Sequence, residues 1–172
     1  DISEVDILKA LDIGMHGVQI PNVQNYSDVE KIIKYSKYPP LGNRGFSPFT
    51  RSGDYSLKNA KIITQKANAN TLIGINVEGE DAIKNIDKIL EFENLDIVFI
   101  GLFDLSKSMG IPGEVENSKV LKYLEQLTKK ILDSGKFPGT IATSVETKKM
   151  FIEMGLKYLL YLVDCEVLKS GY

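Results

Sequence analysis

The sequence has very few of the residues that form covalent or metal-bound cross-links. Its 172 residues include one cysteine, Cys165, and one histidine, His16. A single thiol excludes an internal disulfide and a thiolate metal cluster, and it fits a reducing cytosol. We expect Cys165 to be a small buried apolar residue. His16 lies in the turn between Gly14 and Gly17, where we expect an ordinary loop histidine.

Neither charge nor hydropathy predicts a nucleic-acid or membrane partner. The formal net charge of −2 provides no basic stripe for nucleic acid. A helix needs about 20 consecutive apolar residues to cross a bilayer, and no apolar run in the sequence approaches that length. No secretory signal is visible. The sequence also has no Gly-rich phosphate loop, and no lysine is isolated in an apolar strand, which argues against a Schiff-base enzyme. We therefore expect a soluble cytoplasmic protein that acts on small molecules.

The length predicts one domain. A chain of 172 residues with 43% hydrophobic composition can form one sizeable core but hardly two. We therefore assign residues 1–172 to a single domain. Because the chain begins at Asp1 without an initiator methionine, we expect that its N-terminal part has been trimmed.

Helical and strand patterns alternate along the chain. Apolar runs predict five strands, at residues 18–21, 72–78, 97–101, 137–142 and 158–163. Helical spacing or capping patterns predict intervening helices that begin near Ser27, Leu57, Ala82, Val120 and Thr143. The segment 41–55 is rich in Gly, Pro and Ser, and its length indicates a functional or mobile loop. This alternation is typical of a parallel sheet with right-handed crossovers.

Two α/β architectures are compatible with five such units. A complete (β/α)8 barrel usually needs about 250 residues, so length alone favours an open doubly wound sheet. An open sheet gathers its polar groups at one crevice, however, whereas here they follow all five strands. A partial barrel explains this distribution better. The polar residues at or beyond the strand ends are Gln19, Asn22, Glu78, Asp104, Thr140 and Asp164.

Two of these residues indicate the chemistry. Glu78 and Asp104 each stand just past an apolar run that we predict to be a buried parallel strand. The carboxyl ends of such strands meet at one face, where α/β proteins build their active sites. Because an unpaired buried carboxylate is costly, two that converge there indicate a bound divalent cation.

Several sequence blocks occur in a characteristic order along the chain. They are LDIG (11–14), YPPLGNRG (38–45), VE (77–78), AIKNIDKI (82–89), FIGLFDLS (99–106) and VD (163–164). These blocks closely resemble the metal-dependent pyruvate aldolases of the HpcH/HpaI type, the 2,4-dihydroxyhept-2-ene-1,7-dioate aldolases and their relatives. The resemblance implies a TIM barrel, here lacking its first strands, and a divalent ion such as Mn, Co or Mg. It also implies reversible cleavage of 2-keto-4-hydroxy acids to pyruvate and an aldehyde by a homo-oligomer, a hexamer in relatives.

The resemblance also implies site residues. Glu78 and Asp104 match the two metal ligands, and Asn76 stands where the family commonly has a substrate-contacting glutamine. The backbone N–H groups of Phe103 and Asp104 match the pair that holds the pyruvate carboxylate. Asp12 matches the aspartate that raises the basicity of the catalytic histidine. That histidine and a transition-state arginine belong to a segment upstream of the part that matches this chain, which corresponds to about the last two-thirds of such an enzyme.

Other functions and roles stay open at this point. A citryl- or malyl-thioester lyase on the same barrel, or a catalytically incomplete remnant that binds a metal or keto acid, are the alternatives. Arg44 either shapes its loop or contacts substrate or a neighbouring subunit. Asp164 caps the last helix or serves the site. Thr140 and Thr143 are candidates for substrate contact, although Thr143 has the simpler role of a helix N-cap.

Overall fold

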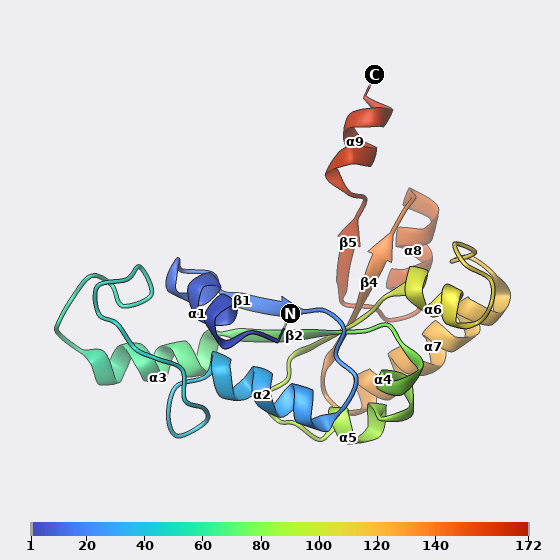
Figure 1. Cartoon of the computed structure of the whole chain (residues 1–172). Helices are drawn as coiled ribbons and strands as arrows, with labels where there is room; N and C mark the ends of the chain where they lie inside the picture. Colours follow the sequence, from blue (N-terminus) through green and yellow to red (C-terminus); the bar gives the residue numbers. More distant parts are fainter. Residues whose placement is uncertain (1, 172) are drawn as a thin grey trace.

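The fold is a five-stranded parallel sheet with helices between the strands (Figure 1). The computed structural model describes residues 2–171. The strands are β1 (Gly17–Ile20), β2 (Leu72–Val77), β3 (Ile97–Ile100), β4 (Phe137–Ala142) and β5 (Tyr158–Tyr161). The helices are α1 (Glu4–Asp12), α2 (Tyr26–Ser36), α3 (Ala60–Asn70), α4 (Glu80–Lys84), α5 (Ile86–Leu90), α6 (Leu102–Ser108), α7 (Ser118–Asp133), α8 (Val145–Glu153) and α9 (Asp164–Ser170). All five predicted strands are therefore confirmed.

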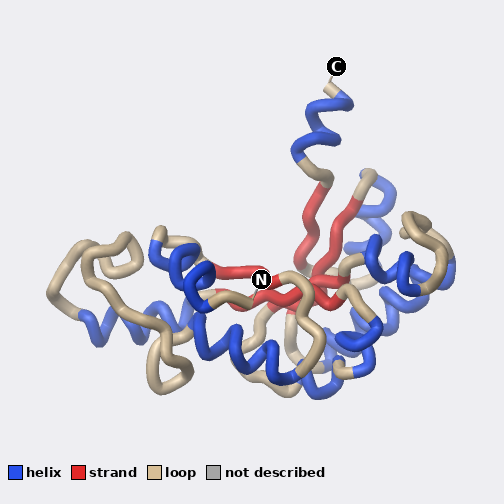
Figure 2. Tube along the Cα trace, in the orientation of Figure 1, coloured by secondary structure: helices blue, strands red, loops and turns tan. Residues whose placement is uncertain are grey.

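The strands follow one another across the sheet in chain order. Each strand pairs in parallel with the next, and the register places Gln19 beside Gly74 and Val77 beside Ile100. A doubly wound sheet would reverse its order at a switch point, and this one does not. The sheet curls, so that β1 and β2 run across the view whereas β4 and β5 run toward its top (Figure 2). The architecture is an α/β half-barrel of parallel strands.

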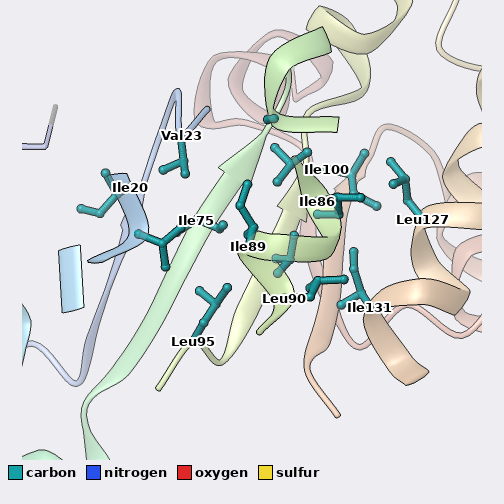
Figure 3. Close-up of a cluster of buried hydrophobic side chains, with 14 of the residues drawn as sticks. Ile20, Val23, Ile75, Ile86, Ile89, Leu90, Leu95, Ile100, Leu127 and Ile131 are labelled. Atoms are coloured by element: carbon teal, nitrogen blue, oxygen red, sulfur yellow. The ribbon is translucent and has the colours of Figure 1, made fainter. Parts of the chain in front are cut away.

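The hydrophobic core lies between the outer face of the sheet and the helices. Alternate β2 residues Ile73, Ile75 and Val77 are buried on that face, since strand side chains point to opposite sides in turn. Figure 3 shows Ile75 beside Ile89 and Leu95 in this cluster. Burying each such side chain stabilises the fold by about 1.5–3 kcal/mol. The core thus fixes which face of β2 remains for the site.

The inner, concave face of the sheet is different. It carries polar and aromatic side chains such as Asn76 and Tyr158, together with apolar residues that are only partly covered. Leu72, Phe137 and Leu160 on this face are 45%, 51% and 39% exposed. Within residues 2–171, no helix is long and apolar enough to cross a membrane.

Local capping differs from the sequence prediction in two helices. Helix α2 is capped by Asn25, whose side chain accepts from the Asp28 N–H, so it begins before Ser27. Helix α8 is capped by Ser144 in a reciprocal capping box with Thr147. The prediction of Thr143 as the N-cap is wrong by one residue, because several hydroxyl residues stand together and only the backbone conformation selects among them.

Three further expectations are corrected by the structure. The predicted helix near 82–90 is two short helices, α4 and α5, which meet at Asn85. The helix expected from Leu57 begins at Ala60. Cys165 is exposed rather than buried, because it belongs to α9, all of whose residues are exposed.

Candidate functional site

The two carboxylates singled out by the sequence line one cavity. Strands β2 and β3 are paired, and Val77 lies beside Ile100, so Glu78 emerges next to Gly101 at the start of α6. Asp104 follows in the first turn of that helix. The cavity has a volume of about 490 Å³ and is lined by Asn22, Glu78, Gly79, Asp104, Lys107 and Ser108. The structure thus places Glu78 and Asp104 in the lining of one cavity.

Backbone groups hold the Glu78 side chain in place. Its Oε1 accepts a 2.8 Å hydrogen bond from the Asn22 N–H, and Asn22 adopts a left-handed conformation with φ 56° just after β1. Gly101 leaves room on the other side. A Cβ at position 101 would lie 2.8 Å from Glu78 Cβ and 3.0 Å from Glu78 Oε2. The position of this carboxylate therefore depends on a neighbouring strand end and on a glycine.

Asp104 is less constrained. Its Oδ1 lies 3.9 Å from Lys107 Nζ, and both side chains are largely exposed. Such a surface pair contributes about 0–1 kcal/mol, so it does not prevent the carboxylate from binding another cation. Asp104 is therefore available to a ligand in the cavity.

The two carboxylates fit a divalent metal ion. Hard cations such as Mg²⁺ and Mn²⁺ prefer carboxylate oxygens, and they keep some positions for water or substrate. In the described part of the chain, no three His, Cys, Asp or Glu residues are grouped for a metal. Glu78 and Asp104 would thus supply two ligands, and the remaining positions would stay open to other oxygen donors.

Asn76 lies below the cavity on the inner face of β2. It precedes Glu78 by two residues and so shares its face of the strand. Asn76 Oδ1 accepts from Gln19 Nε2 at 2.7 Å, and Tyr158 Oη donates to Gln19 Oε1 at 3.1 Å. Asn76 does not itself line the cavity. Phe103 is 50% exposed, and its N–H lies in the first turn of α6, where helical bonding leaves such groups without an acceptor.

Asp12 lies away from this cavity. It ends α1, just before β1, and therefore belongs to the opposite end of the sheet from Glu78. Arg44 Nη2 contacts Asp12 Oδ1 at 2.8 Å and Ser52 Oγ at 3.2 Å, and the guanidinium lies 4.6 Å above the Tyr38 ring. These contacts support the loop-shaping role of Arg44. The catalytic role of Asp12 stays a prediction, because Asp12 does not line the cavity that Glu78 and Asp104 share.

The other candidates have structural positions. Thr140 is fully buried, and its hydroxyl donates to the Ile100 carbonyl at 2.8 Å. Thr143 is exposed outside the cavity lining. Asp164 is the first residue of α9, and its Oδ1 accepts from the N–H of the next residue, Cys165, at 2.8 Å. The prediction that Asp164 caps this helix is wrong, because the N-cap is Val163 and no side chain makes a capping bond there. His16 lies in the predicted turn, at a second cavity near Arg44.

Two buried lysines lie at the amino ends of the strands. Lys37 Nζ donates to the Asn68 and Thr71 carbonyls at 2.8 and 2.7 Å. Burial lowers the pKa of Lys37 and of Lys136, and the charge of nearby Asp96 partly offsets this in both. Both lysines lie at the opposite end of the strands from Glu78. Their lowered pKa values make the stability of the fold depend on pH.

Sequence reasoning missed Lys107 and Tyr158. Lys107 could have been found, because it stands three residues after Asp104 and therefore on the same side of a helix. Tyr158 gave no local indication, since its partner Gln19 is 139 residues away. Only the curl of the sheet brings these two side chains together.

Comparison with known proteins gives a consistent result. A family model described as HpcH/HpaI aldolase/citrate lyase matches residues 2–162. The chain is 33% identical over 171 residues to 4-hydroxy-2-oxo-heptane-1,7-dioate aldolase of Shigella flexneri, covering 95% of this chain and 61% of that protein. The protein of that name from Klebsiella pneumoniae is 30% identical, with 97% and 63% covered. The chain thus spans less than two-thirds of the length of these relatives.

Solved structures of the same family have a similar fold. The HpcH/HpaI aldolase from Desulfitobacterium hafniense has a TM-score of 0.91 and 29% identity, with 98% of this chain and 65% of that chain covered. The citrate synthase SbnG has a TM-score of 0.82 and 25% identity, with 96% and 64% covered. The half-barrel therefore matches about two-thirds of each of these larger structures.

Proposed function

Because this chain belongs to the HpcH/HpaI aldolase/citrate lyase family, we propose that the protein is a metal-dependent aldolase. Its substrate is a 2-keto-4-hydroxy (2-keto-3-deoxy) acid, which it cleaves to pyruvate and an aldehyde. The observation that carries the proposal is the convergence of Glu78 and Asp104 on one cavity at the carboxyl ends of β2 and β3. The related proteins named as aldolases of a 4-hydroxy-2-oxo acid support the substrate class.

A divalent ion, Mn, Co or Mg, would be held by Glu78 and Asp104. When bound, such an ion acts as a Lewis acid that stabilises the negative charge developing on the keto oxygen as the C–C bond breaks, an effect worth several kcal/mol. The Asn22 N–H, which donates to Glu78 Oε1, would hold this carboxylate in place when the ion binds. The backbone N–H groups of Phe103 and Asp104 bind the carboxylate of the keto acid.

The larger assembly is also part of this proposal. The half-barrel of β1–β5 belongs to a complete TIM barrel, and residues 1–172 form part of that single domain. The open inner face supports this, because Phe137 and Leu160 remain partly exposed there. We further propose a cytoplasmic homo-oligomer, with a catalytic histidine and arginine supplied from outside residues 1–172.

Substitution of the carboxylates tests the proposal. We expect Glu78→Gln and Asp104→Asn each to weaken Mn²⁺ binding at least about tenfold, because each removes one charged ligand. Isothermal titration calorimetry on the purified protein measures this. Glu80→Gln is the matched control, since Glu80 is exposed and pairs with Lys84 at 3.1 Å. Mn²⁺ affinity retained in both site variants would overturn the metal assignment.

The thioester-lyase alternative is less well supported. A citryl- or malyl-thioester lyase must hold the phosphates of a coenzyme A arm, and phosphates are bound by clustered cations. Among residues 2–171, Lys107 is the one cationic side chain that lines the Glu78 cavity. Comparing pyruvate with an acyl-coenzyme A thioester as ligands of the Mn²⁺-loaded protein separates the two activities. A remnant without catalysis would bind pyruvate but release no product from keto acids.

A further inference from the structure

Asn22 connects the end of β1 to the Glu78 carboxylate. It lies two residues beyond Ile20, the last residue of β1, and it lines the same cavity as Glu78 and Asp104. Its backbone N–H donates to Glu78 Oε1 at 2.8 Å, although Glu78 itself follows β2. Among residues 2–171, this is the one hydrogen bond that the Glu78 side chain accepts. The orientation of the carboxylate therefore depends on the backbone at position 22.

The backbone of Asn22 has a left-handed conformation. Its φ is 56°, a region in which the Cβ of an L-residue lies too close to the following carbonyl oxygen. Glycine adopts this φ freely because it has no Cβ. Asparagine tolerates it because its short polar side chain forms local hydrogen bonds, and Asn22 Oδ1 accepts from Gln24 Nε2 at 3.2 Å. Asparagine and glycine are thus well suited to position 22, whereas alanine is not.

This φ determines where the Asn22 N–H is directed. The angle is the rotation about the N–Cα bond, so it relates the direction of the N–H to the direction in which the chain continues. The chain is held on both sides, by Ile20 in β1 and by Asn25, which caps α2. A change to an ordinary negative φ would rotate this bond by about 110°. The N–H would then turn away from Glu78, because the flanking elements keep their places.

We propose that Asn22 is a positioning residue for the metal site, and that its left-handed backbone rather than its side chain holds Glu78 ready for a divalent cation. This inference rests on the proposed function, in which Glu78 is a metal ligand. A ligand that is already ordered loses less freedom when the ion binds, so its orientation raises the affinity. Within residues 2–171, Glu78 Oε2 accepts no hydrogen bond, and it remains for the ion.

Calorimetry of Mn²⁺ binding to the full-length protein tests the proposal. We expect Asn22→Ala to weaken Mn²⁺ binding about three- to tenfold, because alanine disfavours the left-handed backbone that directs the N–H at Glu78. Asn22→Gly should bind Mn²⁺ within about twofold of the wild type, since glycine keeps this backbone although it also lacks the side chain. The glycine variant therefore separates the backbone of Asn22 from its amide group.

Asn59→Ala is the matched control. Asn59 is also left-handed, with φ 65°, but it precedes α3 and does not line the cavity. The same substitution there should lower the melting temperature about as much as Asn22→Ala does and leave Mn²⁺ affinity unchanged. The control thus distinguishes general backbone strain from an effect on the metal site.

The outcomes separate this inference from the proposed function. Wild-type Mn²⁺ affinity in Asn22→Ala overturns the positioning role, whether or not the melting temperature falls. Equal losses of affinity in Asn22→Ala and Asn22→Gly also overturn it, because they would assign the effect to the side chain. If Glu78→Gln weakens Mn²⁺ binding in the same experiments, the proposed function stands although this inference fails. If Glu78→Gln retains wild-type Mn²⁺ affinity, both fail.

Discussion

Replacing Gly101 by alanine is the sharpest structural test of the Glu78 site. Gly101 has φ −80° and ψ 94°, which alanine adopts without strain. The added Cβ, however, would lie 2.8 Å from Glu78 Cβ, whereas carbon atoms prefer about 3.5–4.0 Å. The two groups must separate by roughly 0.7 Å, a kind of overpacking that costs about 1–3 kcal/mol. The movement would also stretch the 2.8 Å bond from the Asn22 N–H to Glu78 Oε1.

We therefore expect Gly101→Ala to lower the free energy of unfolding by about 1–3 kcal/mol and Mn²⁺ affinity by about tenfold. Urea denaturation and calorimetry measure the two effects. Gly45→Ala makes the same chemical change where the new Cβ would meet only Leu8 Cδ2, at 3.9 Å, so its Mn²⁺ affinity should equal that of the wild type. A Gly101→Ala protein with wild-type stability and Mn²⁺ affinity would refute the packing argument and the placement of Glu78.

Two further predictions concern the opposite end of the sheet. Asp12→Ala should destabilise the protein by about 3 kcal/mol in urea denaturation, because it leaves the buried Arg44 guanidinium without its charged partner; a loss below about 1 kcal/mol would contradict this. Burial lowers the pKa of Lys136 below 10.5 in the folded state, so the unfolded chain binds more protons between the two pKa values, and stability rises with pH across that interval. Lys136→Met should make this rise smaller and leave the part that Lys37 contributes in the same way, and parallel stability–pH curves for wild type and variant would show that Lys136 does not titrate as described.

The alternation of elements could be predicted from local sequence. The strand at 137–142 is an apolar run that ends where predicted, and the α7 residues Val120, Leu124 and Leu127 repeat at helical spacing and are buried. Such patterns reflect which faces must leave water, and burial then follows them. Helix starts were less certain, because Thr143 and Ser144 are chemically similar caps and differ only in backbone conformation.

Part of the candidate site could be predicted as well. Glu78 and Asp104 were found because each follows an apolar strand, and parallel strands bring their carboxyl ends to one face. Lys107 was missed although helical spacing places it beside Asp104. The catalytic role predicted for Asp12 rests on the family resemblance alone. In the structure, Asp12 forms an ion pair with Arg44.

The five strands, their parallel direction and the two carboxylates at neighbouring strand ends follow from periodicity and chain order, so they can be predicted from the amino-acid sequence. The contact of Tyr158 with Gln19, and the room that Gly101 leaves for Glu78, exist only in the folded molecule. Those contacts join residues from different strands, and their distances depend on how far the sheet curls. Curl is a property of all five strands packed together, so no local pattern specifies it.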